Sequence, residues 1–405
     1  MYLVRYSWRM TITEAAPSGV SAGLDQLLDA SLRSLDLTDT EYELAVSRYR
    51  GVGRVMDEHW SSSPGENVVS PQGSFLLGTV IRPVGREEEV DIDIVVNKDV
   101  LKSSVTQVEL KNDVGDGLRK YAGGVPARPA LDESDRCWTL QWNGMHMDVL
   151  PAIPDTTSAS GTGLFITDRA LRNWQYSDPA GYAAWFRGRM ATDFLQKEAV
   201  LAKRLQVDEV PSWKVKTTLQ QTVQALKRHR DLYFAENLDN RPSSIILTTL
   251  AGLAYRGGGN LYDVVREVTG GMAQHLQRVD GVWFLPNPVQ AQENFADYWE
   301  IEPARADRFF EWLEVAMDDF GAFANGGGLN TAVTRLQKAF GAHAGDAAAR
   351  SMSEELFTAR TTGALKMAGG TGLLTVASVG ATATSATAAT SRRVGDHAFR
   401  GGTKP

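Results

Sequence analysis

Two aspartates separated by one residue could bind a metal ion. Asp91 and Asp93 alternate with isoleucines in the apolar run 90–96. A β-strand there would place both carboxylates on one face and the isoleucines on the other. Carboxylates held side by side repel each other unless a cation lies between them, and Mg²⁺ is the usual choice where phosphates are handled. The spacing therefore predicts a strand that binds metal.

A third aspartate, Asp148, follows the pair Asn143-Gly144. An Asn-Gly pair between two apolar runs is the strongest short-range signal for a β-hairpin. Residues 137–142 and 145–150 therefore predict two strands, the second of which returns Asp148 beside the first two acids. A buried carboxylate there would need a cationic partner. Three such carboxylates can hold two ions roughly 3.5–4 Å apart, which activate an attacking hydroxyl and neutralise a leaving pyrophosphate.

Gly73 and Ser74 precede the acidic strand and could contact a phosphate. A glycine allows close approach of the backbone, and a serine that opens a short helix offers its hydroxyl and free backbone N–H groups. Each signal alone is weak, because a Gly-Ser pair is commonly a turn and an Asp-x-Asp pair is commonly solvated. Together, in this order, they favour the catalytic sheet of a nucleotidyltransferase.

The motifs in residues 72–83, 91–93 and 146–154 together resemble the bacterial cGAS/DncV-like nucleotidyltransferases (CD-NTases) of the polymerase-β-like superfamily. The resemblance continues through residues 226–231 and 241–250 and again through 287–299. It implies an α+β fold, in which a polymerase-β-like palm with a mixed sheet and flanking helices is followed by a C-terminal helical lobe. Nucleotides are then expected in the cleft between the two.

This resemblance also implies an organisation of the chain and a set of site residues. We expect a nucleotidyltransferase core with an N-terminal bracing helix over residues 1–205, a helical nucleotide-binding lobe over 206–365 and a flexible Gly/Ala/Thr-rich tail over 366–405. The catalytic, metal-binding residues are expected to be Asp91, Asp93 and Asp148. The nucleotide-binding residues are expected to be Gln72, Gly73, Ser74, Lys227 and Ser244.

The activity implied by the resemblance is synthesis of a cyclic di- or trinucleotide second messenger that activates a CBASS anti-phage effector. ATP, GTP or other NTPs would be the substrates, and two Mg²⁺ ions, with Mn²⁺ as a substitute, would be the cofactors. Two alternatives stay open: a linear oligonucleotide synthetase or other nucleotidyl transfer of the same superfamily, and an inactive binding partner that acts through its tail. The intact carboxylates argue against the second.

The composition of the chain indicates its cellular compartment and the kind of substrate that accepts the nucleotide. The chain has 405 residues, of which 43% are hydrophobic, so it can form two lobes with separate cores. The single cysteine, Cys137, excludes a disulfide framework and suits the cytoplasm. A net charge of −7 without a broad basic track argues against long nucleic acid and for free nucleotides.

The sequence also predicts helices around the site and offers alternative roles for one histidine and three aromatic residues. Residues 38–41 form a capping box that predicts a long helix, and the pattern from residue 211 onward predicts helices. His146 could contact a metal or phosphate, or support the acids from behind. Trp138, Trp142 and Tyr255 could stack on a base or fill the core.

The C-terminal tail is expected to be a flexible linker. Residues 367–391 carry no charge but are too rich in Gly, Ala, Thr and Ser to predict a membrane span. The distinctive residues 392–393 and 396–402 are either a disordered terminus or a tail that is docked on, or covalently joined to, a CBASS accessory protein.

Overall fold

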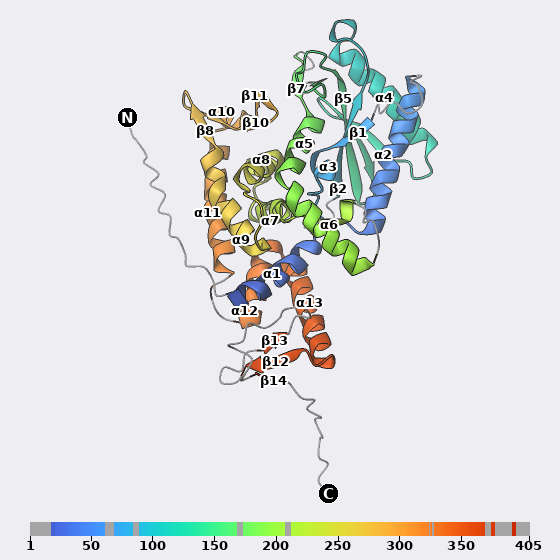
Figure 1. Cartoon of the computed structure of the whole chain (residues 1–405). Helices are drawn as coiled ribbons and strands as arrows, with labels where there is room; N and C mark the ends of the chain where they lie inside the picture. The colour runs from blue at the N-terminus through green and yellow to red at the C-terminus, as the bar shows by residue number, and fades with distance from the viewer. Residues whose placement is uncertain are drawn as a thin grey trace.

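The computed structural model describes residues 18–60, 69–83, 89–167, 173–206, 212–323, 325, 328–368, 374–376 and 391–393. The chain has two large hydrophobic cores. One lies between a mixed sheet and the helices that cover it, and we call this part the sheet lobe. The other lies within a bundle of helices, which we call the helical lobe. Figure 1 shows the two lobes side by side.

The sheet lobe is built on strands in the order β1-β2-β5-β4-β3, and β6 and β7 extend it beyond the end of β5. The central pair, β2 and β5, runs parallel, and the other pairs are antiparallel. The predicted hairpin between β4 and β5 is confirmed, with Gly144 in the turn at φ 78°. The strands are β1 (Val69–Gln72), β2 (Val90–Asn97), β3 (Ala130–Glu133), β4 (Trp138–Trp142), β5 (Met145–Pro154), β6 (Leu164–Ile166) and β7 (Gln175–Ser177).

Two long helices, α2 (Asp39–His59) and α4 (Gln107–Gly124), contribute to the core of the sheet lobe. Each begins with a capping box, and the first of these, between Thr38 and Glu41, confirms the helix start predicted from the sequence. Helix α2 also contacts the beginning of the helical lobe, because Lys214 Nζ lies 2.7 Å from Asp39 Oδ2. It therefore touches both lobes, and its role as a bracing helix stays a prediction.

The helical lobe surrounds α7 (Thr218–Tyr233), in which every residue from Thr218 to Arg230 is buried. Its core includes Phe186 and Trp312. The short α3 (Gly73–Leu77) packs between the lobes: Phe75 belongs to the core of the sheet lobe and Leu77 to that of the helical lobe. The other helices are α1 (Ser18–Arg33), α5 (Pro179–Arg189), α6 (Ala191–Leu205), α8 (Ser244–Ala254), α9 (Leu261–Gly271), α10 (Tyr298–Ile301), α11 (Ala304–Ala322), α12 (Gly328–Phe340) and α13 (Ala342–Thr361).

Four short strands interrupt the region from residue 211 onward, for which the sequence predicts helices. They form two hairpins, β8 (Gln277–Val279) with β9 (Val282–Phe284) and β10 (Pro286–Asn287) with β11 (Gln290–Asn294). Asp280-Gly281 connects β8 and β9, with φ values of 50° and 88°. An Asp-Gly pair with two positive φ angles favours a tight hairpin turn, a local signal that outweighs the helical pattern around it.

The C-terminal region contains three short strands, β12 (Leu365–Ala368), β13 (Leu374–Val376) and β14 (Ser391–Arg393), which pair in a small sheet. The sequence predicts no strands there. The rest of the expected tail, including residues 396–402, lies outside the described residues, so the predicted docking of an accessory protein stays a prediction. Among the described helices, none combines the length and apolar character needed to cross a membrane.

Candidate active site

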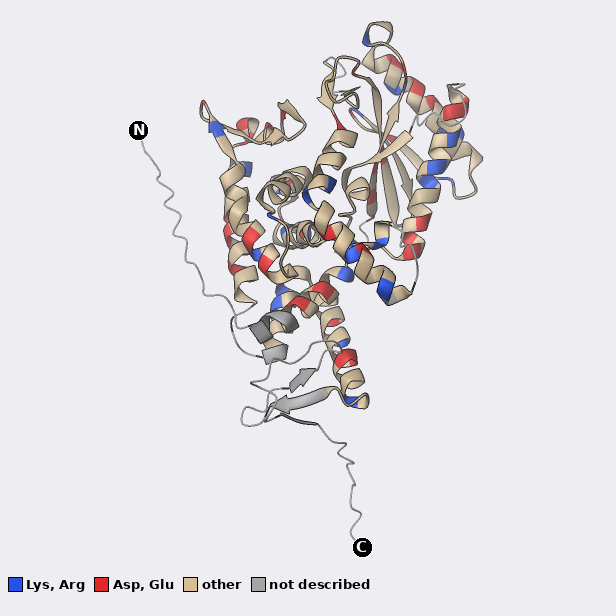
Figure 2. Cartoon of the chain, in the orientation of Figure 1, with Lys and Arg blue, Asp and Glu red and all other residues tan. Residues whose placement is uncertain are grey.

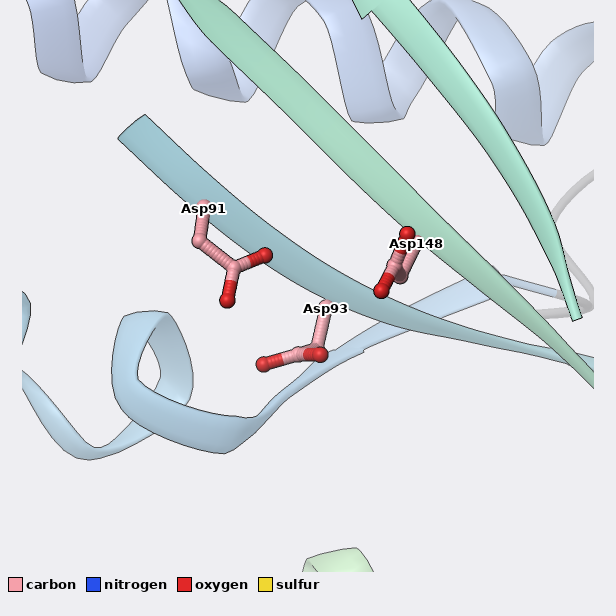
Figure 3. A group of neighbouring side chains, drawn as sticks. All are labelled: Asp91, Asp93 and Asp148. Atoms are coloured by element: carbon pink, nitrogen blue, oxygen red, sulfur yellow. The ribbon is translucent and has the colours of Figure 1, made fainter. Parts of the chain in front are cut away.

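The three predicted metal ligands lie together on the parallel strands β2 and β5. Asp93 is the register partner of Asp148, and Asp91 lies two residues earlier on the same face of β2. Each of the three offers a carboxylate oxygen, and these oxygens lie within 4.8 Å of one another. Figure 3 shows the three side chains converging beside α3. An all-oxygen carboxylate set is the donor set that Mg²⁺ and Mn²⁺ prefer, so these residues fit a hard divalent ion.

Gly73 lies against one of these carboxylates. It has a φ of 58°, and a Cβ atom at this position would lie 2.2 Å from Asp93 Oδ2. Only glycine fits both this left-handed backbone conformation and the space left by the carboxylate. The pairing of β1 with β2 sets this contact, because Gln72 is the register partner of Asp93. The structure thus brings Gln72, Gly73 and the adjoining Ser74 next to the acidic strand.

Two neighbouring side chains orient the acids. Thr139, on β4, donates a hydrogen bond of 2.7 Å from Oγ1 to Asp148 Oδ1. His146, on β5, places Nε2 3.0 Å from Asp91 Oδ1, and this hydrogen bond raises the pKa of the imidazole. Of the two roles considered for His146, its contact favours support of an acid from behind. Thr139 is not among the predicted site residues, although its place opposite Asp148 in the predicted hairpin is a usable signal.

The carboxylates repel one another. Burial, together with the neighbouring charges of Asp91 and Asp148, raises the pKa of Asp93 to about 7. The charge of Lys227 partly offsets this shift. A divalent cation at this position would remove the repulsion, so the site is electrostatically prepared for a metal.

Lys227 reaches the site from the helical lobe. It lies on α7, is 6% exposed, and its Nζ donates to the carbonyl oxygen of Thr79 at 3.1 Å. Burial, together with the charge of nearby Arg230, lowers the pKa of Lys227 to about 8, while Asp91 and Asp93 oppose the shift. The structure therefore brings Lys227 within electrostatic reach of the acids.

Ser244 is the first residue of α8, and its hydroxyl has a cationic neighbour. Arg230 Nη1 donates to Ser244 Oγ at 3.0 Å and to the carbonyl oxygen of Pro242 at 2.9 Å. Arg230 lies three residues after Lys227, so both project from neighbouring positions on α7. Arg230 is not among the predicted nucleotide-binding residues, although it belongs to the same basic run as Lys227. Arg230 connects Ser244 to the helix that carries Lys227.

The aromatic candidates for base stacking belong to the hydrophobic cores. Trp138, Trp142 and Tyr255 are 3%, 7% and 1% exposed. Trp138 Nε1 donates to the carbonyl oxygen of Lys111, which satisfies the polar group of that buried ring. Of the two roles considered for these rings, core packing is the one that their burial favours.

A cavity of about 670 Å³ lies on another side of α3. Its lining includes the stacked rings of Tyr42 and Trp213, whose centroids are 4.3 Å apart, and the basic residues Lys214 and Lys216. None of the predicted site residues lines it. The acids therefore lie outside this cavity, and the position of the nucleotides between the lobes stays a prediction.

Comparisons with known proteins identify a family domain and relatives that are similar to this chain. Residues 23–189 match the Second Messenger Oligonucleotide or Dinucleotide Synthetase domain. The c-di-GMP synthase of Roseivirga ehrenbergii is 26% identical over 339 residues, which cover 82% of this chain and 87% of that protein.

Two solved structures share the fold. CdnG of Bradyrhizobium diazoefficiens, solved in complex with GTP, has a TM-score of 0.63 and 21% identity and covers 82% of this chain and 99% of its own. DncV of Vibrio cholerae, a cyclic AMP–GMP synthase, has a TM-score of 0.59 and 14% identity and covers 80% of this chain and 98% of its own. It has also been solved with the linear intermediate 5′-pppA(3′,5′)pG. These likenesses confirm the predicted fold.

Proposed function

Because this chain belongs to the cGAS/DncV-like nucleotidyltransferases, we propose that it joins two or three NTPs into a cyclic oligonucleotide with release of pyrophosphate. The observation that carries this proposal is the convergence of Asp91, Asp93 and Asp148 beside Gly73. The relatives are synthases of cyclic dinucleotides, which supports a cyclic over a linear product. The role of this family in CBASS implies that the product would activate a CBASS effector in the cytoplasm.

In this proposal the three aspartates and the turn at Gly73-Ser74, which we call the phosphate turn, have separate roles. Asp91 and Asp93 would hold the ion that neutralises the triphosphate, and Asp148 would join them in holding the ion that activates the attacking ribose hydroxyl. The backbone at Gly73 and the hydroxyl of Ser74 hold the β- and γ-phosphates, with Gln72 beside them. Lys227 and Ser244 reach the same triphosphate from the helical lobe.

The reaction is an in-line displacement at the α-phosphorus. When bound, two Mg²⁺ ions, or Mn²⁺ in their place, supply an activated hydroxyl and neutralise the charge of the leaving pyrophosphate. Protein side chains then take little part in covalent chemistry. They position the reacting groups and stabilise the charge that develops on the phosphates. A second round in the same site, on a linear intermediate that has turned over, closes the ring.

Free nucleotides are the proposed substrates. Figure 2 shows acidic and basic residues interspersed along the helices of both lobes, in keeping with the net charge of −7. Binding to a long nucleic acid would need a basic track, because neutralised phosphates supply most of the affinity. ATP and GTP are proposed first, since CdnG was solved with GTP and the linear intermediate in DncV contains both bases.

Product analysis tests the proposal. The protein is incubated with all four NTPs and Mg²⁺, treated with phosphatase, and the products are identified by mass spectrometry. We expect a phosphatase-resistant cyclic oligonucleotide, and none from the variant Asp91→Asn with Asp93→Asn. A product that loses terminal phosphates would identify a linear synthetase. Incorporation that the double variant leaves unchanged would refute the metal-site assignment.

A further inference from the structure

In the described part of the chain no strand pairs with residues 78–82, which follow Gly73-Ser74 and the rest of α3, yet most of their carbonyl groups accept hydrogen bonds. Residues 78–82 follow α3 and lie along the buried helix α7. Buried carbonyl groups need donors. Here side chains from the start of the helical lobe supply them. The pairs are Gln220 to Leu77, Lys216 to Gly78, Lys227 to Thr79, Gln224 to Val80 and Arg228 to Arg82.

Four of these donors form one stripe on α7. Gln220, Gln224, Lys227 and Arg228 lie at spacings of four, three and one residues, and all four are at most 7% exposed. Helix geometry places positions separated by three and four residues on one face. The stripe therefore runs alongside residues 77–82, and each donor has its own carbonyl.

Gln224 contacts two separate parts of the chain. It is fully buried, and its Nε2 donates both to Val80 O at 2.8 Å and to Asp36 Oδ1 at 2.7 Å. Asp36, in the turn before α2, also pairs with Lys216 at 3.0 Å. One amide thus connects the helical lobe to the segment after the phosphate turn and to the turn before α2.

Gln220 fixes the end of α3. Its Nε2 donates to Leu77 O at 2.9 Å, and its Oε1 accepts from the Thr217 N–H, which completes the capping box of α7. A Cβ atom on Gly78 would come within 2.4 Å of the same Nε2, so the contact leaves no room for a side chain. The carbonyl of Ser74 accepts from the Thr79 N–H at 2.9 Å, which continues the hydrogen bonding back to the phosphate turn.

We propose that Gln224 and Gln220 are positioning residues that hold the phosphate turn at Gly73-Ser74 and Lys227 in register with the three aspartates. This proposal rests on the proposed function. The same helix face carries the glutamines and Lys227, so fixing residues 77–82 to that face sets the distance between the turn and the ammonium group. Misplacement of a catalytic group by about 1 Å can cost about 100-fold in rate.

The helix also provides a matched control. Gln221 is 2% exposed, and its Nε2 donates to Asp29 Oδ1, on α1, at 2.7 Å. Gln221→Met and Gln224→Met each remove a buried amide and a hydrogen bond to an aspartate. Only Gln224→Met removes the contact with residues 77–82.

The test measures kcat and KM for NTPs, together with Tm, in Gln221→Met, Gln224→Met and the wild type. We expect similar losses of Tm in both variants, but a kcat about 10-fold lower in Gln224→Met alone, with KM changed less than threefold. Gln220→Glu is a second variant, because its carboxylate keeps the capping box and loses the donor to Leu77. It should also lower kcat, and its Tm should fall as well, because the buried carboxylate faces the Leu77 carbonyl oxygen.

The outcomes separate the two proposals. Equal kcat values in Gln224→Met and Gln221→Met, or a normal kcat in Gln220→Glu, would overturn the positioning role. A wild-type protein that incorporates no nucleotide would instead refute the proposed function.

Discussion

At the scale of single residues, the acidic site depends on a glycine as much as on its acids. The Cβ of Gly73→Ala would lie 2.2 Å from Asp93 Oδ2, so the carboxylate must move. We expect kcat to fall about 100-fold, because an ångström of displacement misaligns the reacting groups. Steady-state turnover with Mg²⁺ and NTPs measures the loss.

Gly144 is the matched control for this substitution. It also has a positive φ, 78°, but nothing lies within 4 Å of its Cβ position. Gly144→Ala should cost about 1 kcal/mol of stability from backbone strain and leave kcat within twofold of the wild type. If the two variants lost activity equally, the contact with Asp93 would not be the cause.

Asp93 links stability to pH in the metal-free protein. Its pKa is raised from 3.8 to about 7, so the folded state holds this proton more tightly than the unfolded state does. This contribution to stability is present below pH 4 and is lost as pH rises to about 7. Bound Mn²⁺ replaces the proton, so the gain in Tm on adding Mn²⁺ should grow between pH 5.5 and 8.

Asp93→Asn tests the same electrostatics without a pH series. Removing a repelled charge should raise the stability of the metal-free protein at pH 8 by on the order of 2 kcal/mol, while abolishing turnover. Chemical unfolding with and without Mn²⁺ measures both effects. A variant less stable than the wild type, and still stabilised by Mn²⁺, would show that Asp93 is not a repelled metal ligand.

At the scale of elements, the neighbouring strand orients an acid. Thr139→Val keeps the shape of the side chain and removes the 2.7 Å hydrogen bond to Asp148. We expect Mn²⁺ affinity to fall about 10-fold, since partners of metal ligands typically contribute this much. Titration calorimetry measures the affinity, and Thr139→Ser, which keeps the hydroxyl, should restore it. Failure of the serine to restore binding would mean that packing, not the hydrogen bond, matters.

The elements that could be predicted are those with local signals. The capping box at Thr38 and the turn at Asn143-Gly144 act within a few residues, and the structure has both. The strands from β8 to β11 were missed because a helical pattern in the flanking residues obscured the Asp280-Gly281 turn. The donors Gln220 and Gln224 could not be predicted, because their partners lie more than 140 residues away in the chain.

At the scale of the whole molecule, the cores do not follow the order of the chain. Helices α1 and α5 contribute Leu28 and Phe186 to the helical core, although both precede α7. The division at residue 205 stays a prediction, and side-chain packing alone would assign these two helices to the helical lobe. A sequence pattern shows which face of a helix is apolar, but it does not show which core that face joins.

Among the residues whose burial the structure describes, the buried apolar side chains end within α13. Among the described residues, the last core residue in the chain is Ala359. We therefore expect a chain ending at Gly363 to retain kcat within twofold and to keep its Tm. Product formation and thermal melting of the truncated protein measure this. A large loss of kcat at unchanged Tm would give the tail a part in catalysis.

The central claim is that Asp91, Asp93 and Asp148 together hold the catalytic ions. Anomalous diffraction from crystals grown with Mn²⁺ and a non-hydrolysable NTP analogue tests it most directly. The account predicts two manganese peaks roughly 3.5–4 Å apart between the three carboxylates, with the triphosphate at Gly73-Ser74. A triphosphate bound with its manganese elsewhere, and no anomalous peak between the aspartates, would contradict it.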